Sequence, residues 1–284
     1  STISTFDVYG LDLPALGEDL DTEVNVPSNA NYTVQSLTWT GLGSTVCTGT
    51  SGVCQIVLKA NAGYTFKSYD HMTKVLNGDI GKEMFQKIAE EQGILPLGAF
   101  YLGTRQISLS MDKHIKTPAD LNGINLRMPN SDAWVFLGKA MGVNPTPIGF
   151  NDLYLALQTG TVQGQDNPLP TVKSAKFYEV QKSISLTNHL VDSVWPTINL
   201  DTWNKLTDTQ KGWVLEAVEA ARVACDTQNL QTEAEVVSFL ESQGLKVYEA
   251  DVAAFAEHVL DKYLNDPISD TWDKDLLAKI QAMA

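Results

Sequence analysis

The sequence predicts an α/β fold with largely parallel sheets. From about residue 69 onward, strand-like and helix-like segments alternate at short spacing, as they do in parallel sheets covered by helices. Several helix starts carry a capping residue that is followed by proline or an acidic residue. The chain has no run of about 18 or more apolar residues, which excludes a transmembrane helix and direct insertion into a membrane.

Length and charge set limits on the partners. The 284 residues suffice for one large domain or for two of ordinary size. The formal net charge is -14, from 34 acidic against 20 basic side chains. Because nucleic acids and anionic membrane surfaces require a basic face, this charge argues against both as main partners.

The first 64 residues differ from the rest. Residues 32–39 and 53–58 have the composition of strands. Cys47 and Cys54 bracket a small polar loop and could close a local disulfide in an oxidising compartment. Cys225 lies in a helical stretch, where we expect a small core residue, and the cysteine spacing gives no zinc signature. The chain begins at residue 1 without a signal peptide, which fits a processed or trimmed protein.

Helices and strands follow in turn along the remaining chain. Thr207 and Gln210 fit a capping box that opens a long amphipathic helix, which we expect to reach about Leu240. The other helices are expected at 70–92, 117–123, 132–142, 151–160, 251–264 and 273–283. The strands are expected at 95–101, 106–110, 124–128, 162–165, 183–187, 194–200 and 245–248.

Arginine is rare in this chain, which has Arg105, Arg127 and Arg222. Side chains alternate across a strand, so Arg127 lies on the opposite face of strand 124–128 from Leu126 and Met128. The carboxyl end of such a strand, followed by a helix N-terminus, is where open α/β sheets bind ligands. The guanidinium and the helix amides both favour an anion there.

Two further residues could share this site. Asn167 stands at the carboxyl end of a second short strand, and Arg105 begins another. Pattern alone leaves two interpretations open. Either the three side chains form one binding site, or Arg127 pairs with an acidic residue and Asn167 forms a turn before Pro168.

Enzyme signatures are absent from the sequence. It has no Gly-x-Ser-x-Gly elbow, no Walker or Rossmann glycine loop and no His-Glu-x-x-His motif. The scattered histidines, which we expect to be structural or exposed, are His71, His114, His189 and His258. We therefore expect a non-enzyme without a metal or other cofactor.

Several ordered motifs resemble one known family. They are the segments 69–71, 103–105, 117–130, 142–147, 155–168 and 176–182. Together they resemble the DctP-type solute-binding proteins of tripartite ATP-independent periplasmic (TRAP) transporters, over about residues 64–284. The first 64 residues depart from this family: either residues 17–63 are an insertion, or residues 32–39 stand in for the first strand.

The resemblance implies a two-lobed periplasmic binding protein fold, with hinge strands and a long helix that spans both lobes. Lobe I would contain residues 1–104 and about 193–232, and lobe II residues 105–192 and about 233–284. The helix that begins after Thr207 resembles the spanning helix of the family.

The resemblance also implies a function and a set of binding residues. The family captures organic acids in the periplasm and delivers them to a membrane permease. Arg127 matches the arginine that clamps the ligand carboxylate, while Arg105, Asn167 and Phe150 match other pocket positions; Trp195, on a hinge-side strand, is expected to line the pocket. The ligand stays open among sugar acids, keto acids and C4-dicarboxylates. A sensory or chemotactic binding protein is the alternative, and an enzyme that acts on a small acid is the remote one.

Overall fold

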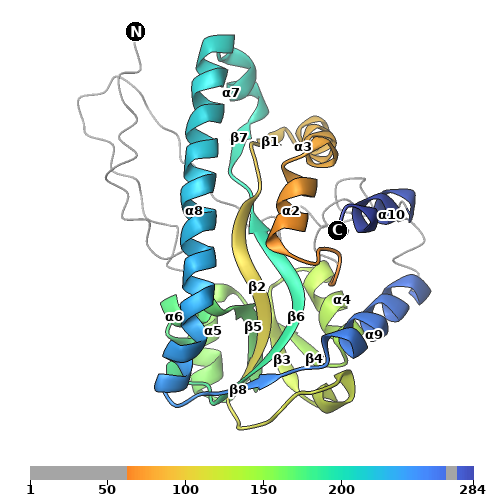
Figure 1. Ribbon diagram of the computed structural model, residues 1–284, viewed down its shortest axis with the longest axis vertical. Helices are drawn as coiled ribbons and strands as arrows, with labels where there is room; N and C mark the ends of the chain where they lie inside the picture. Colours follow the sequence, from red (N-terminus) through yellow and green to blue (C-terminus); the bar gives the residue numbers. More distant parts are fainter. Residues whose placement is uncertain (1–62, 267–273) are drawn as a thin grey trace.

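The structure, a computed structural model that describes residues 63–266 and 274–284, confirms the α/β class (Figure 1). The strands are β1 (Ile94–Pro96), β2 (Phe100–Leu109), β3 (Asn125–Met128), β4 (Asn144–Pro147), β5 (Gly164–Pro168), β6 (Ser183–Val194), β7 (Thr197–Asn199) and β8 (Lys246–Glu249). The main sheet has the strand order β4-β3-β5-β2-β6-β8, and a smaller sheet pairs β1 with β7.

The main sheet is mixed, whereas the sequence predicted largely parallel pairing. The pairs β3–β4, β3–β5 and β6–β8 are parallel. The long central strand β2 runs antiparallel to both of its neighbours, β5 and β6. Parallel pairs require crossover connections, and helices supply them between β3, β4 and β5. Periodicity alone does not show that β2 enters this sheet from the opposite end.

Helices cover both faces of the sheet and build the upper part of the molecule. They are α2 (Tyr69–Leu76), α3 (Asp79–Gln92), α4 (Asp132–Met141), α5 (Phe150–Gln158), α6 (Leu169–Ser174), α7 (Leu200–Lys205), α8 (Asp208–Ser242), α9 (Val252–Asn265) and α10 (Lys274–Ala282), with the 3-10 turns η2 (Pro118–Leu121) and η3 (Phe177–Glu179). The predicted capping box of Thr207 and Gln210 opens α8, which has 35 residues.

The helix predicted at 70–92 is two helices, α2 and α3. Asn77 ends α2, and its side chain bonds the backbone of Ala99 twice, at 2.8 Å to the amide nitrogen and 3.0 Å to the carbonyl oxygen. A side chain at Gly78 would collide with the carbonyl oxygen of Lys74. The break therefore depends on a long-range contact that helical periodicity does not register.

Two lobes are linked by three elements, as the resemblance implied. In Figure 1, α2, α3, α7, β1 and β7 form the upper lobe, and β3, β4, β5 and β8 with α4, α5, α6 and α9 form the lower one. Strands β2 and β6 and the long helix α8 run through both. Of the predicted binding residues, Arg127, Asn167 and Phe150 belong to β3, β5 and α5 of the lower lobe.

The core divides in the same way. The first hydrophobic cluster, which includes Met72, Ile88 and Trp195, lies in the upper lobe. The second cluster includes Leu126 and covers one face of the main sheet. The third cluster lies against α5, α6 and the lower part of α8. Ile280 of α10 packs in the first cluster.

A glutamate and an aspartate of α8 hold the helix against β2 where that strand passes between the lobes. The pairing of β2 with β6 shifts register between Tyr101 and Gly103. Asp226 accepts a hydrogen bond of 2.7 Å from the Tyr101 amide, and Glu233 accepts one of 2.6 Å from the Thr104 amide. These carboxylates satisfy backbone donors of the irregular strand, which would otherwise be costly to bury.

Some sequence predictions fall outside the described residues. These are the Cys47–Cys54 disulfide, the strands at 32–39 and 53–58, and the insertion at 17–63. Cys225 is buried on α8, as expected, and burial raises the pKa of its thiol to about 12. Among the described helices, none combines the length and the apolar character that crossing a bilayer requires.

Candidate ligand-binding site

Arg127 lies in β3 on the face that the sequence predicted. Leu126 and Met128 are fully buried in the second cluster, and Arg127 points to the opposite face of the sheet. Arg127 is only 3% exposed to solvent. The alternation rule therefore placed this charge correctly, and tertiary packing has removed most of its water.

The guanidinium of Arg127 has few partners. Its Nε donates a 2.8 Å hydrogen bond to the carbonyl oxygen of Ile148, which follows β4. The two terminal nitrogens form no hydrogen bond or ion pair with any described residue. Burial lowers the pKa of this group to about 10, with nearby Arg105 contributing and Asp166 opposing. It is therefore a cation at neutral pH whose planar fork has no carboxylate partner within the described ranges.

Asn167 lies on the same face, one strand away. In the parallel pairing of β3 with β5, Arg127 is opposite Gln165, and Asn167 follows two residues later. Both β5 side chains are buried, and Nδ2 of Asn167 donates to Oε1 of Gln165. The cation and the carboxamide are therefore diagonal neighbours on one face of two adjacent strands, within reach of each other for long side chains. That arrangement suits two side chains that bind one small polar group.

Phe150 closes the same side of the lobe. It is the first residue of α5, two positions after the Ile148 carbonyl that binds Arg127. Its ring lies edge-on to Phe177, with 5.7 Å between the ring centroids. Gly149, not Asn151, is the N-cap of this helix. The sequence suggested Asn151 as the N-cap, so the helix begins two residues earlier than that cap implies, and Phe150 stands in its first turn.

Arg105 lies on the other face of the sheet. In the pairing of β2 with β5, its cross-strand neighbour is Pro168, so it shares a face with Asp166 and not with Asn167. Its Nε donates to Oδ2 of Asp166 at 2.7 Å, and one terminal nitrogen donates to Asp192 at 2.7 Å. The other terminal nitrogen donates to the Asp166 carbonyl at 2.6 Å, and Trp134 stacks 4.4 Å from the guanidinium carbon.

Burial and pairing set the charges of the Arg105 cluster. Burial alone would raise the pKa of Asp166, but the charge of Arg105 and the hydrogen bond from His189 hold it well below its usual range. Burial raises the pKa of Asp192 despite the same arginine. The pKa of Arg105 is raised because its two carboxylate partners outweigh its own burial. Arg105 is therefore locked as a cation inside a packed ion-pair network.

His189 completes this network. It is fully buried, its Nε2 lies 3.2 Å from Oδ2 of Asp166, and its Nδ1 lies 2.8 Å from the Thr187 hydroxyl. The prediction of a structural or exposed histidine did not foresee this contact. Oδ1 of Asp166 is buried without a hydrogen-bond partner among the described residues. His189 and Asp166 are 23 positions apart in the sequence, so no local sequence pattern indicates that the two side chains are in contact.

Trp195 lies away from these groups. It follows β6 and packs in the first cluster, with its ring edge-on to Phe85 at 5.0 Å between centroids. Its indole nitrogen donates to the Ser193 hydroxyl at 2.9 Å. The structure thus places Arg127 and Asn167 on one face of the sheet and Arg105 on the other. Phe150 lies two residues after the carbonyl that binds Arg127, and Trp195 lies in the upper lobe.

The Arg127 face combines groups that suit an anion. It presents a cation whose terminal nitrogens have no partner among the described residues, with a carboxamide on the neighbouring strand. Within the described ranges, no group of three histidine, cysteine, aspartate or glutamate side chains is placed to hold a metal ion. The sequence prediction did not include Gln165 or Asp192, although Gln165 shares the period-two alternation of Asn167 and could have been found by that rule.

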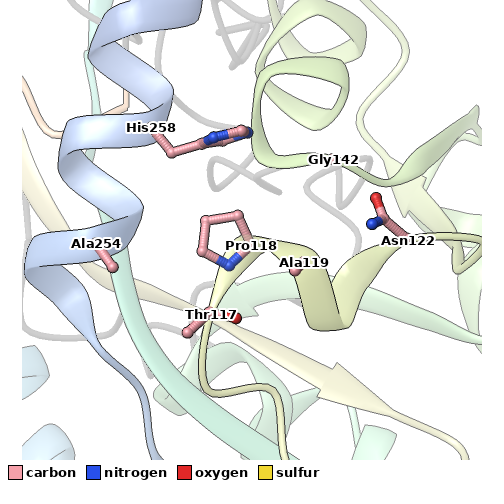
Figure 2. Close-up of a pocket in the computed structure, with 7 residues that line it drawn as sticks. All are labelled: Thr117, Pro118, Ala119, Asn122, Gly142, Ala254 and His258. Atoms are coloured by element: carbon pink, nitrogen blue, oxygen red, sulfur yellow. The ribbon is translucent and has the colours of Figure 1, made fainter.

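A separate pocket lies elsewhere on the lower lobe (Figure 2). It has a volume of about 350 Å³ and lies between η2, the end of α4 and α9. Its lining consists of Thr117, Pro118, Ala119, Asn122, Gly142, Ala254 and His258. None of the predicted site residues lines it. The residues that line this pocket include no arginine or lysine, whereas Arg127 supplies a cation to its face of the main sheet.

Comparison with known proteins finds relatives that cover most of this chain. The sialic acid-binding periplasmic protein SiaP of Vibrio cholerae is 38% identical over 195 residues, which are 68% of this chain and 60% of that protein. A solute-binding protein of Roseobacter denitrificans is 36% identical over 71% of this chain and 61% of its own length. The chain therefore spans about three fifths of these relatives.

Solved structures show the same fold. A TRAP periplasmic solute-binding protein of Roseobacter denitrificans, with bound 3-deoxy-D-manno-oct-2-ulosonic acid, is 43% identical with a TM-score of 0.76. The match covers 78% of this chain and 74% of that one. The model of the DctP family, bacterial extracellular solute-binding protein family 7, matches residues 40–266. The chain belongs to this family of solute-binding proteins.

Proposed function

We propose that the protein is an extracytoplasmic solute-binding protein that captures an organic acid by its carboxylate. Arg127 clamps the carboxylate, Asn167 binds a neighbouring oxygen, and Phe150 packs against the carbon chain. Arg105 supports the site from the opposite face of the sheet, and Trp195 contributes from the upper lobe when the lobes close. Binding is the whole activity, with no bond made or broken in the ligand.

The observation that carries this proposal is the unpaired guanidinium of Arg127. It is 3% exposed, and its only hydrogen bond to a described residue goes to one backbone carbonyl. A buried charge is costly unless it is paired. A planar cation with free terminal nitrogens binds a carboxylate in a bidentate manner. A ligand acid supplies the missing partner.

Relatives narrow the class of acid. Their names specify sialic acid, 2,3-diketo-L-gulonate, 3-deoxy-D-manno-oct-2-ulosonic acid and L-galactonate. These are sugar acids, with an oxygen on the carbon next to the carboxylate. We propose that this protein binds a sugar acid in the periplasm and delivers it to the membrane permease of a TRAP transporter.

Binding can be tested with acids and their neutral counterparts. Thermal unfolding of the purified chain is measured with L-galactonate, sialic acid, 3-deoxy-D-manno-oct-2-ulosonic acid and succinate, and with galactose as the uncharged control. An acid at 100 times its dissociation constant stabilises a protein by about 2.7 kcal/mol, and galactose is expected to have no effect. Stabilisation by galactose equal to that by galactonate would refute the carboxylate clamp.

Arg127→Ala tests the clamp directly. We expect calorimetry to show at least a hundredfold loss of affinity for the acid, because the variant leaves a buried carboxylate unpaired. Arg222→Ala is the matched control, since Arg222 lies on α8 and binds Glu219 and Asp226. Near-normal affinity in Arg127→Ala would overturn the assignment. Adjacent genes for a small and a large membrane subunit would support transport over sensing.

A further inference from the structure

One buried glutamine connects three strands on the Arg127 face. Gln165 of β5 is opposite Arg127 in the pairing with β3 and opposite Ser108 in the pairing with β2. Gln165 and Ser108 are both fully buried. Side chains of paired residues share a face, so Gln165 stands between the cation and the serine, with Asn167 two residues further along its own strand.

Hydrogen bonds connect Asn167, Gln165 and Ser108 in one order. Nδ2 of Asn167 donates to Oε1 of Gln165, and Nε2 of Gln165 donates to the Ser108 hydroxyl at 2.5 Å. The cross-strand neighbour of Asn167 is Gln106, whose amide bonds Asn188 instead. Gln165 is therefore the only described side chain that orients the Asn167 carboxamide.

The orientation decides what Asn167 can offer a ligand. A carboxamide has a donor end and an acceptor end. With Nδ2 bound to Gln165, Oδ1 of Asn167 has no partner among the described residues and is available as an acceptor. Because Asn167 lies diagonally across from Arg127 on the same face, we expect Oδ1 to reach a ligand whose carboxylate binds Arg127. An acceptor at that place matches a hydroxyl on the carbon next to the carboxylate.

We propose that Gln165 is a positioning residue, which turns the Asn167 carboxamide so that its oxygen accepts a hydrogen bond from the 2-hydroxyl of a bound acid. Gln165 does not touch the ligand and acts through Asn167, with Ser108 as its anchor. The ligand contact rests on the proposed function, whereas the orientation of Asn167 does not. The proposed function and the positioning role of Gln165 can therefore be refuted separately.

The first test needs no ligand. Hydrogen exchange of the Asn167 side-chain amide is followed by NMR, with its signal assigned from Asn167→Asp. Gln165→Met removes both side-chain hydrogen bonds of Gln165 and keeps a side chain of similar length. We therefore expect at least tenfold faster exchange of the Asn167 side-chain amide. Gln181→Met is the matched control, because Gln181 is also buried and donates to the Ser108 carbonyl but forms no hydrogen bond with Asn167. Unchanged exchange in Gln165→Met would overturn the proposal.

The second test reads ligand selectivity. Calorimetry compares L-galactonate with 2-deoxy-L-galactonate. In Gln165→Met, we expect about tenfold weaker binding of the hydroxy acid and less than threefold change for the deoxy acid, because one hydrogen bond is affected. Ser108→Ala, a milder change, should shift selectivity in the same direction. Equal losses for both acids would show a merely structural role and overturn the proposal.

The outcomes separate the two proposals. If Arg127→Ala binds acids normally while Gln165→Met accelerates amide exchange, the carboxylate clamp fails and the positioning role stands. If Arg127→Ala loses binding while Gln165→Met changes neither exchange nor selectivity, the clamp stands and the positioning role fails. If the wild type binds neither L-galactonate nor 2-deoxy-L-galactonate, the exchange measurement alone decides the role of Gln165.

Discussion

Two buried arginines lie on opposite faces of one sheet, and their surroundings differ. Arg105 donates to Asp166, to its carbonyl and to Asp192, and stacks on Trp134. Arg127 donates to one carbonyl. Both residues are 3% exposed. Burial therefore does not distinguish the two arginines, but their partners do. Arg105 is paired with carboxylates, whereas the terminal nitrogens of Arg127 have no partner among the described residues, as the proposed clamp requires.

The largest expected effect on stability comes from Arg105→Met. It leaves the buried carboxylates of Asp166 and Asp192 without their cation, so we expect the free energy of unfolding to fall by about 3–5 kcal/mol. Urea denaturation measures this. Lys246→Met, which removes an exposed ion pair with Asp112, is the control and should leave the unfolding midpoint in urea nearly unchanged, because solvent screens this pair. A loss no larger than that of the control would erase the distinction between the two arginines.

The pH dependence of unfolding sharpens the same comparison. The folded-state pKa of Asp166 is lowered by its partners, so the unfolded state takes up the proton first as the pH falls. The stabilisation is present above the ordinary aspartate pKa of about 3.9 and is lost below it. We expect Asp166→Asn to be less stable at pH 7 and to lose less stability between pH 5 and pH 3. Parallel pH profiles for both proteins would contradict this.

A smaller effect is expected for Trp134→Phe. The indole lies 4.4 Å from the Arg105 guanidinium carbon in a dry environment, where such contacts contribute up to about 2 kcal/mol. The smaller phenyl ring retains part of this, so we expect a loss of about 1–2 kcal/mol in urea denaturation. In a double-mutant cycle with Arg105→Met the losses should not add. Additive losses would mean that the ring packs without supporting the cation.

The smallest change in stability is expected for Arg127→Met. This variant removes a desolvated charge that has one carbonyl partner, so the free energy of unfolding should change by less than about 1 kcal/mol or rise slightly. Urea denaturation without ligand measures this, next to the large loss of acid affinity. A loss of 3 kcal/mol or more would place Arg127 in the same structural class as Arg105.

Local rules predicted the elements that depend on nearby residues. Alternation placed Arg127 opposite Leu126 and Met128, and the capping box of Thr207 opened the long helix α8. The same rules merged α2 and α3, because the break depends on the contact of Asn77 with Ala99. They also missed that β2 runs antiparallel within the main sheet. Period and capping register neighbours in sequence, and these features depend on distant partners.

The predicted site divides along the same line. Arg127 and Asn167 are on one face, because strand alternation and the parallel register of β3 with β5 place them there. Arg105 belonged to the same predicted set, but the antiparallel register of β2 with β5 puts it with Asp166 on the other face. Its environment also involves His189 and Asp192, which lie far along the chain.

By itself, the sequence determined the residue types, the side-chain alternation and the helix caps, because these act over a few neighbouring positions. It also determined the family through its ordered motifs. Only the tertiary structure decided which arginine has carboxylate partners, because strand register and packing bring those carboxylates from distant segments. The different roles proposed for Arg105 and Arg127 thus follow from pairing across the sheet and not from the side chains themselves.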